Sequence, residues 1–140
     1  MFTDKELAFL RQQPIGRLGT ADAAGQPHVV PTGFQVDDER GAIEIGGHDP
    51  GRGRERRYRR NIRVNPKVAF VVDDLVSTNP WTPRAIVIHG LAELRSEGGE
   101  RLGPGFGPTW VEVTPTWISS WGIESPRGPA HARRVATRPS

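Results

Sequence analysis

Short apolar runs separated by turns constrain the fold of this chain more than any other feature. After Pro14, stretches rich in valine, isoleucine and threonine alternate with polar segments, most of them of hairpin length. Connections this short join antiparallel strands, because a parallel pair needs a longer crossover. A closed or nearly closed barrel would remove the exposed edges that so many short strands leave. The expected strands cover residues 15–20, 28–36, 42–46, 67–73, 84–94 with a bulge at Gly90, and 110–121.

Two segments favour helices over strands. Thr3 and Glu6 have the spacing of a capping box, in which each side chain bonds the backbone N–H of the other residue, and they predict a helix over Asp4–Gln12. Residues 54–64 lack strand character and lead into Pro66, before which a helix ends. The expected fold is therefore mainly β, a small antiparallel barrel with a short N-terminal helix and one inserted helix.

Length and composition indicate one domain, which we expect over residues 1–125 of the 140. Residues 126–140 contain three prolines, four arginines and no apolar period, so they are expected to form a flexible tail. The absence of cysteine excludes disulfides, thiolate zinc sites and cysteine nucleophiles. No apolar run approaches the roughly 20 residues of a membrane helix. Acidic residues near the start argue against a signal peptide, so we expect a cytoplasmic protein without membrane association.

Positive charge is concentrated in one internal segment. Residues 52–63 hold seven arginines and a single acid, Glu55. Arginine forms bidentate hydrogen bonds with phosphate and carboxylate groups, so the segment is a candidate site for a discrete anion. A solvated basic helix face explains the same charges equally well. A nucleic-acid-binding surface is disfavoured, because such a surface usually covers a whole face and this segment is embedded between strands.

The motifs of common catalytic centres are missing. The sequence contains neither H-E-x-x-H nor G-x-S-x-G, and its four histidines are scattered. We therefore expect no metal site and no nucleophile of the protein's own. What remains is a strand over 42–46 that leads through Gly46, Gly47 and His48 into the arginine-rich helix. Glycines let a ligand approach the backbone closely, and the start of a helix favours an anion.

Several separated segments carry a resemblance to a known family. They are His-Val-Val-Pro-Thr at 28–32, Ile-Glu-Ile-Gly-Gly at 43–47 and Asn-Pro-Lys-Val-Ala-Phe at 65–70, supported by Gly-Gly-His, Ala-Phe-Val-Val-Asp-Asp-Leu, Pro-Trp-x-Pro-Arg and Ser-Trp-Gly-Ile-Glu. With these segments the chain resembles the pyridoxamine 5′-phosphate oxidase-like family, and most of all its branch that uses the deazaflavin coenzyme F420 in place of FMN. The resemblance runs from Phe2 to Glu124.

The resemblance implies a split β-barrel homodimer with two cofactors bound in grooves between the subunits. It also implies an oxidoreductase that transfers a hydride between coenzyme F420 and a small electron-poor substrate. In such an enzyme the cofactor carries the chemistry, so neither a metal nor a covalent nucleophile is needed. The alternatives are an FMN-binding oxidase or reductase of the same fold and a non-catalytic carrier of coenzyme F420. The resemblance assigns no catalytic residue.

The same resemblance implies a set of cofactor-binding positions. Those along the cofactor ring are His28, Val30, Pro31 and Thr32. Those near the ribityl chain and phosphate are Ile45, Gly46 and Gly47. The basic pair of the family falls on Arg56 and Arg57 or on Arg57 and Tyr58, with Arg52 and Arg54 as further candidates for the phosphate. This choice stays open because the segment has no lysine and is longer than in the family. Arg84 matches a position that can reach the cofactor across the dimer.

Overall fold

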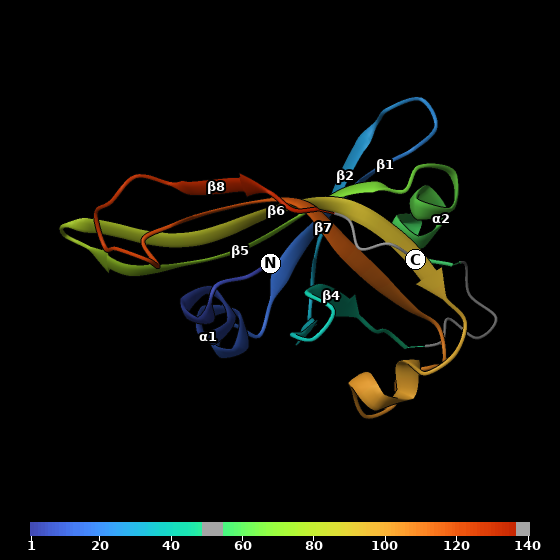
Figure 1. Cartoon of the computed structure of the whole chain (residues 1–140). Helices are drawn as coiled ribbons and strands as arrows, with labels where there is room; N and C mark the ends of the chain where they lie inside the picture. Colours follow the sequence, from blue (N-terminus) through green and yellow to red (C-terminus); the bar gives the residue numbers. More distant parts are fainter. Residues whose placement is uncertain (49–54, 137–140) are drawn as a thin grey trace.

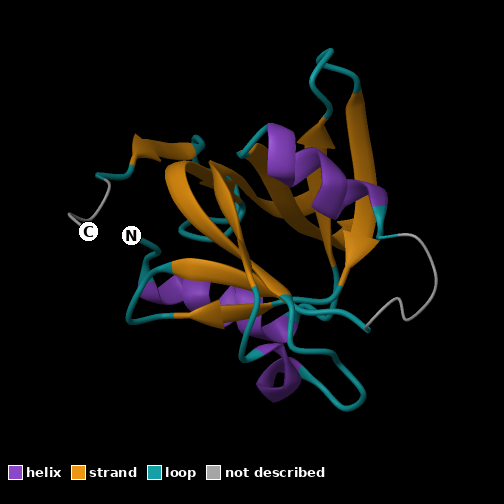
Figure 2. Cartoon of the chain, turned by 90° about the vertical axis from the view of Figure 1, so that its right-hand side faces the viewer, coloured by secondary structure: helices purple, strands orange, loops and turns teal. Residues whose placement is uncertain are grey.

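The computed structural model describes residues 1–48 and 55–136 and shows a split β-barrel with two α-helices packed on it (Figures 1 and 2). No helix among these residues has the length and apolar character needed to cross a membrane. In chain order, the described elements are α1 (Asp4–Gln12), β1 (Gly16–Ala21), β2 (Pro27–Thr32), β3 (Gln35–Asp37), β4 (Ala42–Ile45), α2 (Arg57–Val64), β5 (Lys67–Thr78), β6 (Trp81–Arg95), the 3-10 helix η1 (Gly99–Leu102), β7 (Trp110–Trp121) and β8 (His131–Arg134).

The described strands form one antiparallel sheet. Their order is β2-β1-β5-β6-β7-β4-β3, and β8 adds to β7. The sheet curls so that α2 packs against β1 and β6. The outer part of the β5–β6 hairpin leaves the barrel as an arm, and β8 lies beside it (Figure 1). The predicted mainly β antiparallel barrel with two helices is confirmed.

The start of α1 follows directly from its sequence. The hydroxyl oxygen of Thr3 accepts the backbone N–H of Glu6 at 3.1 Å, and Oε1 of Glu6 accepts the N–H of Thr3 at 2.9 Å. These two bonds satisfy amide groups that a helix start otherwise leaves without partners. The helix covers Asp4–Gln12, as the capping box predicts, and buries Phe9 and Leu10 against the barrel.

Two strand predictions can be compared with the structure in detail. The predicted strand over 28–36 is divided, because β2 ends at Thr32 and β3 begins at Gln35. The predicted bulge at Gly90 is confirmed, since the register of β6 on β7 shifts between His89 and Gly90. Such a bulge bends a strand, which helps a long sheet to close on itself.

The core lies inside the barrel and holds α2 in place. Tyr58 and Ile62 of α2 are buried in it. Buried Asn61 adds a polar anchor, because its Nδ2 donates to the hydroxyl oxygen of Thr20 on β1 at 3.0 Å. The apolar side chains that are less than 2% exposed are Phe70, Leu10, Leu18, Ile43, Ile45, Ile86, Ile88, Ile118, Val72, Val111 and Val113.

The segment after the barrel differs from the expectation of a flexible tail. Within 126–140, residues His131–Arg134 form β8 and pair with β7. Arg133 binds the fully buried carboxylate of Glu6, with Nη1 at 2.8 Å from Oε2 and Nη2 bound to Oε1. The hydroxyl of Ser120 donates to the same carboxylate at 2.6 Å. The expectation is therefore wrong for β8, whose partner in α1 is 127 residues away and leaves no local pattern.

Replacing Arg133 with alanine leaves the Glu6 carboxylate buried without its cation. Loss of one partner from a buried ion pair is costly, so we expect the free energy of unfolding to fall by about 2–4 kcal/mol in urea titrations. Arg134→Ala is the matched control, because Arg134 is exposed on the same strand, and it should change stability by less than about 0.5 kcal/mol. Equal effects of the two variants would contradict this role of Arg133.

The effect of Arg133→Ala should also depend on pH. Burial raises the pKa of Glu6, but hydrogen bonds from Arg133, Ser120 and the Thr3 backbone outweigh burial and leave the pKa below its usual 4.5. A carboxyl whose pKa is lowered by folding stabilises the protein above its ordinary pKa and loses that effect as the pH falls through the folded value. The stability difference between wild type and variant should therefore be largest near neutral pH and shrink below pH 4.5.

Candidate functional site

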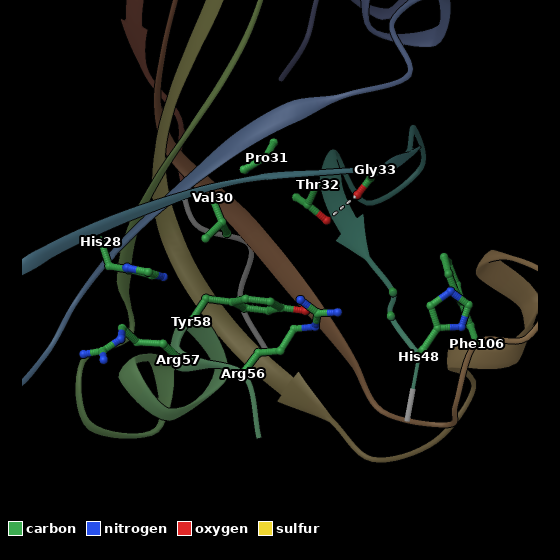
Figure 3. A pocket seen from close by; sticks show the side chains of 12 residues that line it. His28, Val30, Pro31, Thr32, Gly33, His48, Arg56, Arg57, Tyr58 and Phe106 are labelled. Atoms are coloured by element: carbon green, nitrogen blue, oxygen red, sulfur yellow. Dashed lines mark hydrogen bonds between the residues drawn. The ribbon is translucent and has the colours of Figure 1, made fainter. Parts of the chain in front are cut away.

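A cavity of about 390 Å³ lies between β2, the segment after β4 and the start of α2 (Figure 3). We call it pocket 1. Its wall unites segments that are distant in the sequence, because the curled sheet brings both of its ends to this point. Nine of the predicted cofactor-binding residues line it, and they are His28, Val30, Pro31, Thr32, Gly46, Gly47, Arg56, Arg57 and Tyr58.

Strand β2 forms one wall of pocket 1. It stands at the end of the strand order and pairs with β1 alone among the described strands. Side chains alternate across a strand, so the half-buried His28, Val30 and Thr32 share one side. Figure 3 shows His28 and Val30 directed toward α2. Pro31 is tolerated because an edge strand can lack one backbone donor.

The start of α2 forms the opposite wall and is unusually basic. Arg56 is its N-cap residue and makes no capping bond with its side chain, and the first turn contains no acid. Arg56 and Arg57 are exposed, and no carboxylate among the described residues pairs with either of them. The N-terminus of a helix already carries partial positive charge, so these cations repel both it and each other. An anion in pocket 1 would relieve that repulsion.

A third arginine of α2 lies beneath the pocket. Arg59 is only 4% exposed, and within the described part of the chain its Nε has no hydrogen-bond partner. Its Nη2 donates to the carbonyl oxygen of Thr109 at 3.4 Å, and its guanidinium lies 5.8 Å from the ring centre of Tyr58. A Cβ atom on Gly47 would come within 2.9 Å of the same Nη2. The backbone at Gly47 therefore rests directly on a buried cation.

Glu55, the acid next to Arg56 in the sequence, is already paired. Glu55 accepts two bonds from Arg63, at 3.1 Å from Nε and 2.5 Å from Nη2. The hydrogen bonds from Arg63 lower the pKa of Glu55 despite the opposing effect of burial. Glu55 thus pairs with the last turn of α2, and among the described residues no carboxylate compensates the positive charge of the first turn.

Pocket 1 offers binding groups rather than groups for covalent catalysis. Its described lining contains two histidines, two arginines and a tyrosine, with no acid. In the described ranges, no three His, Asp or Glu side chains gather closely enough to hold a metal ion. The arrangement can hold an anion at α2 and place a planar organic group along β2.

Several predicted residues fall elsewhere, and three lining residues were missed. Ile45 is fully buried in the core instead of lining the pocket. Arg84 lies outside pocket 1 of its own chain, where Asp74 binds its guanidinium at 2.9 Å and 2.5 Å, so a role across a dimer stays a prediction. Arg52 and Arg54 lie outside the described residues.

The lining residues absent from the prediction are Gly33, His48 and Phe106. Of these three, His48 had a signal in the sequence, since it completes the Gly-Gly-His motif. Phe106 had none, because it comes from a loop about 60 positions further along the chain. Its ring meets His48 edge-on, with ring centres 5.2 Å apart and planes at 80°. Nδ1 of His48 lies 2.9 Å from the carbonyl oxygen of Gly105, which ties the two loops together.

The fold defines a split barrel that carries a cavity between β2 and α2, and a family comparison agrees with this fold. The family model described as pyridoxamine 5′-phosphate oxidase matches residues 2–122. That range includes β1 to β7 and every described residue of pocket 1. The chain belongs to this family, as the resemblance of its motifs implied.

Individual relatives give a more specific comparison than the family model does. A 5a,11a-dehydrotetracycline/5a,11a-dehydrooxytetracycline reductase of Streptomyces rimosus is 44% identical over 135 residues, which are 96% of this chain and 93% of the reductase. A conserved hypothetical protein of Mycobacterium tuberculosis has a TM-score of 0.69 at 19% identity, over 98% of this chain and 94% of its own. A Listeria innocua protein assigned as a pyridoxamine 5′-phosphate oxidase has a TM-score of 0.63 at 22% identity, over 84% and 96%. The two structures share the fold, and the homologous reductase is an oxidoreductase of this family.

Replacing Gly47 with alanine tests the packing beneath the pocket. The new Cβ would lie 2.9 Å from Nη2 of Arg59 and 3.5 Å from the hydroxyl of Tyr58. Both groups are buried and have little room to move, so we expect the free energy of unfolding to fall by about 1–3 kcal/mol. Urea unfolding monitored by tryptophan fluorescence measures this.

Gly33→Ala is the control for this prediction. Gly33 also lines pocket 1, but a Cβ there would meet only the carbonyl oxygen of Pro14, at 3.7 Å. Its alanine variant should change stability by less than about 0.5 kcal/mol. If alanine is tolerated equally well at Gly47, Arg59 does not pack tightly under that residue.

Proposed function

We propose that the protein is a reductase that binds coenzyme F420 in pocket 1 and transfers a hydride between this cofactor and a small electron-poor molecule. The observation that carries the proposal is the pair Arg56 and Arg57, which line the pocket and have no carboxylate partner among the described residues. FMN is the alternative cofactor, since it would use the same anion site. Both cofactors carry a phosphate group and a planar ring system.

The residues of pocket 1 fit such a cofactor. Arg56 and Arg57 can give a phosphate charge-assisted hydrogen bonds, and the start of α2 adds its partial positive charge. Gly46 and Gly47 have no side chains that would keep a ligand from the backbone. Buried Arg59 adds a further cation beneath Gly47. These features support a discrete anion over a merely solvated basic face.

When bound, the cofactor supplies the hydride chemistry, which none of the side chains in the pocket can supply. The chain itself would bind the cofactor, orient it and exclude water from it. Arg56 and Arg57 would hold the phosphate, and the β2 side chains His28 and Val30 would lie along the ring. The buried ring of Tyr58 would close the floor of the pocket. A reaction whose chemistry the cofactor supplies needs no nucleophile from the protein.

The number of arginines favours coenzyme F420 over FMN. FMN carries a single phosphate, whereas coenzyme F420 carries a phosphodiester followed by an oligoglutamate tail. An extended anion of this kind suits a surface on which Arg60 stands exposed one turn beyond Arg56. The family allows both cofactors, so this choice depends on the charge pattern of α2.

The homologous Streptomyces rimosus reductase supports the substrate class. By its name that protein reduces a dehydrotetracycline, an unsaturated organic molecule. Its 44% identity extends over nearly the whole of both chains. On this basis we propose the same class of reaction for this protein, namely the reduction of an electron-poor small molecule. A non-catalytic carrier of coenzyme F420 is the competing proposal, and it would bind the cofactor without oxidising it in the presence of any acceptor.

A homodimer is part of the proposal. The outer face of the barrel has a cavity of about 690 Å³ over β1, β2, β5 and β6, and its described lining is mostly apolar. Val29 and Leu91 line it with 64% and 42% of their surface exposed. On the arm, Trp81 is 70% exposed. Apolar surface gathered in this way favours a protein interface, and a second copy of the chain is the partner that the family implies.

The double substitution Arg56→Gln and Arg57→Gln tests the anion site. It removes two charge-assisted contacts while helix propensity changes little. We expect the dissociation constant of coenzyme F420 to rise by at least about tenfold, since each such contact is typically worth about 1.5–3 kcal/mol. Fluorescence titrations with coenzyme F420 and with FMN measure the loss and show which ligand binds more tightly.

Arg60→Gln is the matched control on the same helix. Arg60 is exposed and lies outside the described lining of pocket 1. Its loss should leave FMN binding unchanged and weaken binding of coenzyme F420 only modestly, through the exposed oligoglutamate tail. That effect should vanish at high salt because screening removes interactions between exposed charges. Unchanged affinity of the double variant for both cofactors would move the anion site away from Arg56 and Arg57.

Sedimentation velocity tests the homodimer. We expect the wild type to sediment as a dimer at micromolar concentration, and Val29→Asp combined with Leu91→Asp to produce folded monomers, because a buried unpaired charge opposes association. Ile15→Asp is the control, since Ile15 is exposed to an extent between those of Val29 and Leu91 but lies outside this cavity. A wild type that sediments as a folded monomer would contradict the dimer.

A further inference from the structure

The ring of Phe106 belongs to the lining of two neighbouring cavities. One is pocket 1, and the other is a second cavity of about 200 Å³. We call the second one the side cavity. Gly33, Gly46 and Phe106 line both spaces, so Phe106 contributes the one side chain that the two described linings share. Figure 3 shows Phe106 beside His48, at the end of pocket 1 remote from His28 and Arg57.

Two glycines hold the ring in this position. A Cβ atom on Gly46 would lie 2.7 Å from Cδ2 of Phe106, and one on Gly103 would lie 2.6 Å from Cε2. The ring therefore fills a slot between two stretches of bare backbone. His48 contacts it edge-on, and Phe106 itself is half-buried. This packing fixes the position of the ring at the boundary that the two cavities share.

The loop that carries Phe106 is anchored to the sheet on the side of the side cavity. Nη2 of Arg101 in η1 lies 2.7 Å from Oε2 of Glu44 on β4. Nε2 of Gln35 on β3 donates to the carbonyl oxygen of Leu102 at 2.9 Å. These bonds also engage the carboxylate of Glu44 and the amide nitrogen of Gln35, two residues that line the side cavity.

With these groups engaged, the side cavity offers mainly apolar surface. Its apolar side chains are Pro14, Phe34, Leu102 and Phe106. Its walls contain no arginine, lysine or histidine among the described residues, unlike the walls of pocket 1. An apolar group would therefore enter it more readily than a charged one.

We propose that Phe106 is a specificity-determining residue for ligands of pocket 1. Its ring limits the apolar group that a ligand held by Arg56 and Arg57 can extend toward His48, the end of pocket 1 opposite His28, and it withholds the 200 Å³ of the side cavity. The inference rests on the proposed function in one respect, the anion site at α2. It concerns ligand size and is independent of which cofactor the protein uses.

A series of aryl phosphates tests the proposal, because its members share the anion and differ in apolar length. The probes are phenyl phosphate, 4-tert-butylphenyl phosphate and 4-biphenylyl phosphate, titrated by calorimetry. For the wild type, affinity should fall by at least about tenfold from the shortest probe to the longest, as expected when a group meets a closed wall. In Phe106→Ala the longest probe should regain at least about tenfold in affinity, while phenyl phosphate should change by less than about threefold.

Two further variants distinguish a specific effect of the Phe106 ring from a general enlargement of pocket 1. Phe106→Leu retains part of the side chain and should lie between wild type and Phe106→Ala. Val30→Ala also enlarges pocket 1, but Val30 does not line the side cavity, so this variant should keep the wild-type size limit. Thermal unfolding of each variant confirms that it is folded.

The outcomes distinguish this inference from the proposed function. If the probes bind through Arg56 and Arg57 but folded Phe106→Ala and Phe106→Leu retain the wild-type size limit, the role of Phe106 is overturned and the anion site stands. If no probe binds the wild type, the anion site fails and the inference fails with it. A size limit that shifts equally in Val30→Ala would also overturn the role of Phe106.

Discussion

The pairing of β6 along both of its edges is the constraint on which the rest of the fold depends. β5 and β7 both pair with it in antiparallel register over most of its length, and the bulge at Gly90 interrupts only the β7 side. The other strands add to β5 and β7, which places β2 at one end of the order and β4 and β3 toward the other. Pocket 1 forms where the curled sheet brings β2 and the segment after β4 together.

The distribution of charge separates structural ion pairs from the candidate site. Glu44 and Glu112 are direct neighbours across β4 and β7, an arrangement that would be repulsive without cations nearby. Each buried acid has an arginine instead, in the pairs Glu6 with Arg133, Glu44 with Arg101 and Glu112 with Arg95. The arginines at the start of α2 have no such partners among the described residues. That contrast makes the first turn of α2 the place where an anionic ligand is expected.

Pocket 1 has two walls of regular secondary structure and a third wall formed by a loop. The β2 side is part of the sheet, and the α2 side is anchored to β1 by the bond between Asn61 and Thr20. Its third side comes from the loop after η1, which has no strand pairing of its own and carries Phe106. Ligand choice is commonly located in loops supported by a rigid scaffold, because loops can change without disturbing the core. The proposed role of Phe106 follows this division.

The sequence by itself determined the class of fold, the bounds of α1 and most of the residues of pocket 1. Those features depend on local signals, such as the capping box at Thr3 and Glu6, the alternating strands and the arginines of residues 52–63, and on motifs that a family shares. It did not reveal the full length of β5 and β6, because their outer ends lie on the exposed arm and lack an apolar pattern. Only the tertiary structure decided that β8 pairs with β7, that Ile45 belongs to the core and that Phe106 lines the pocket. These contacts join residues far apart in the chain, and no spacing within the sequence encodes which distant partners will meet.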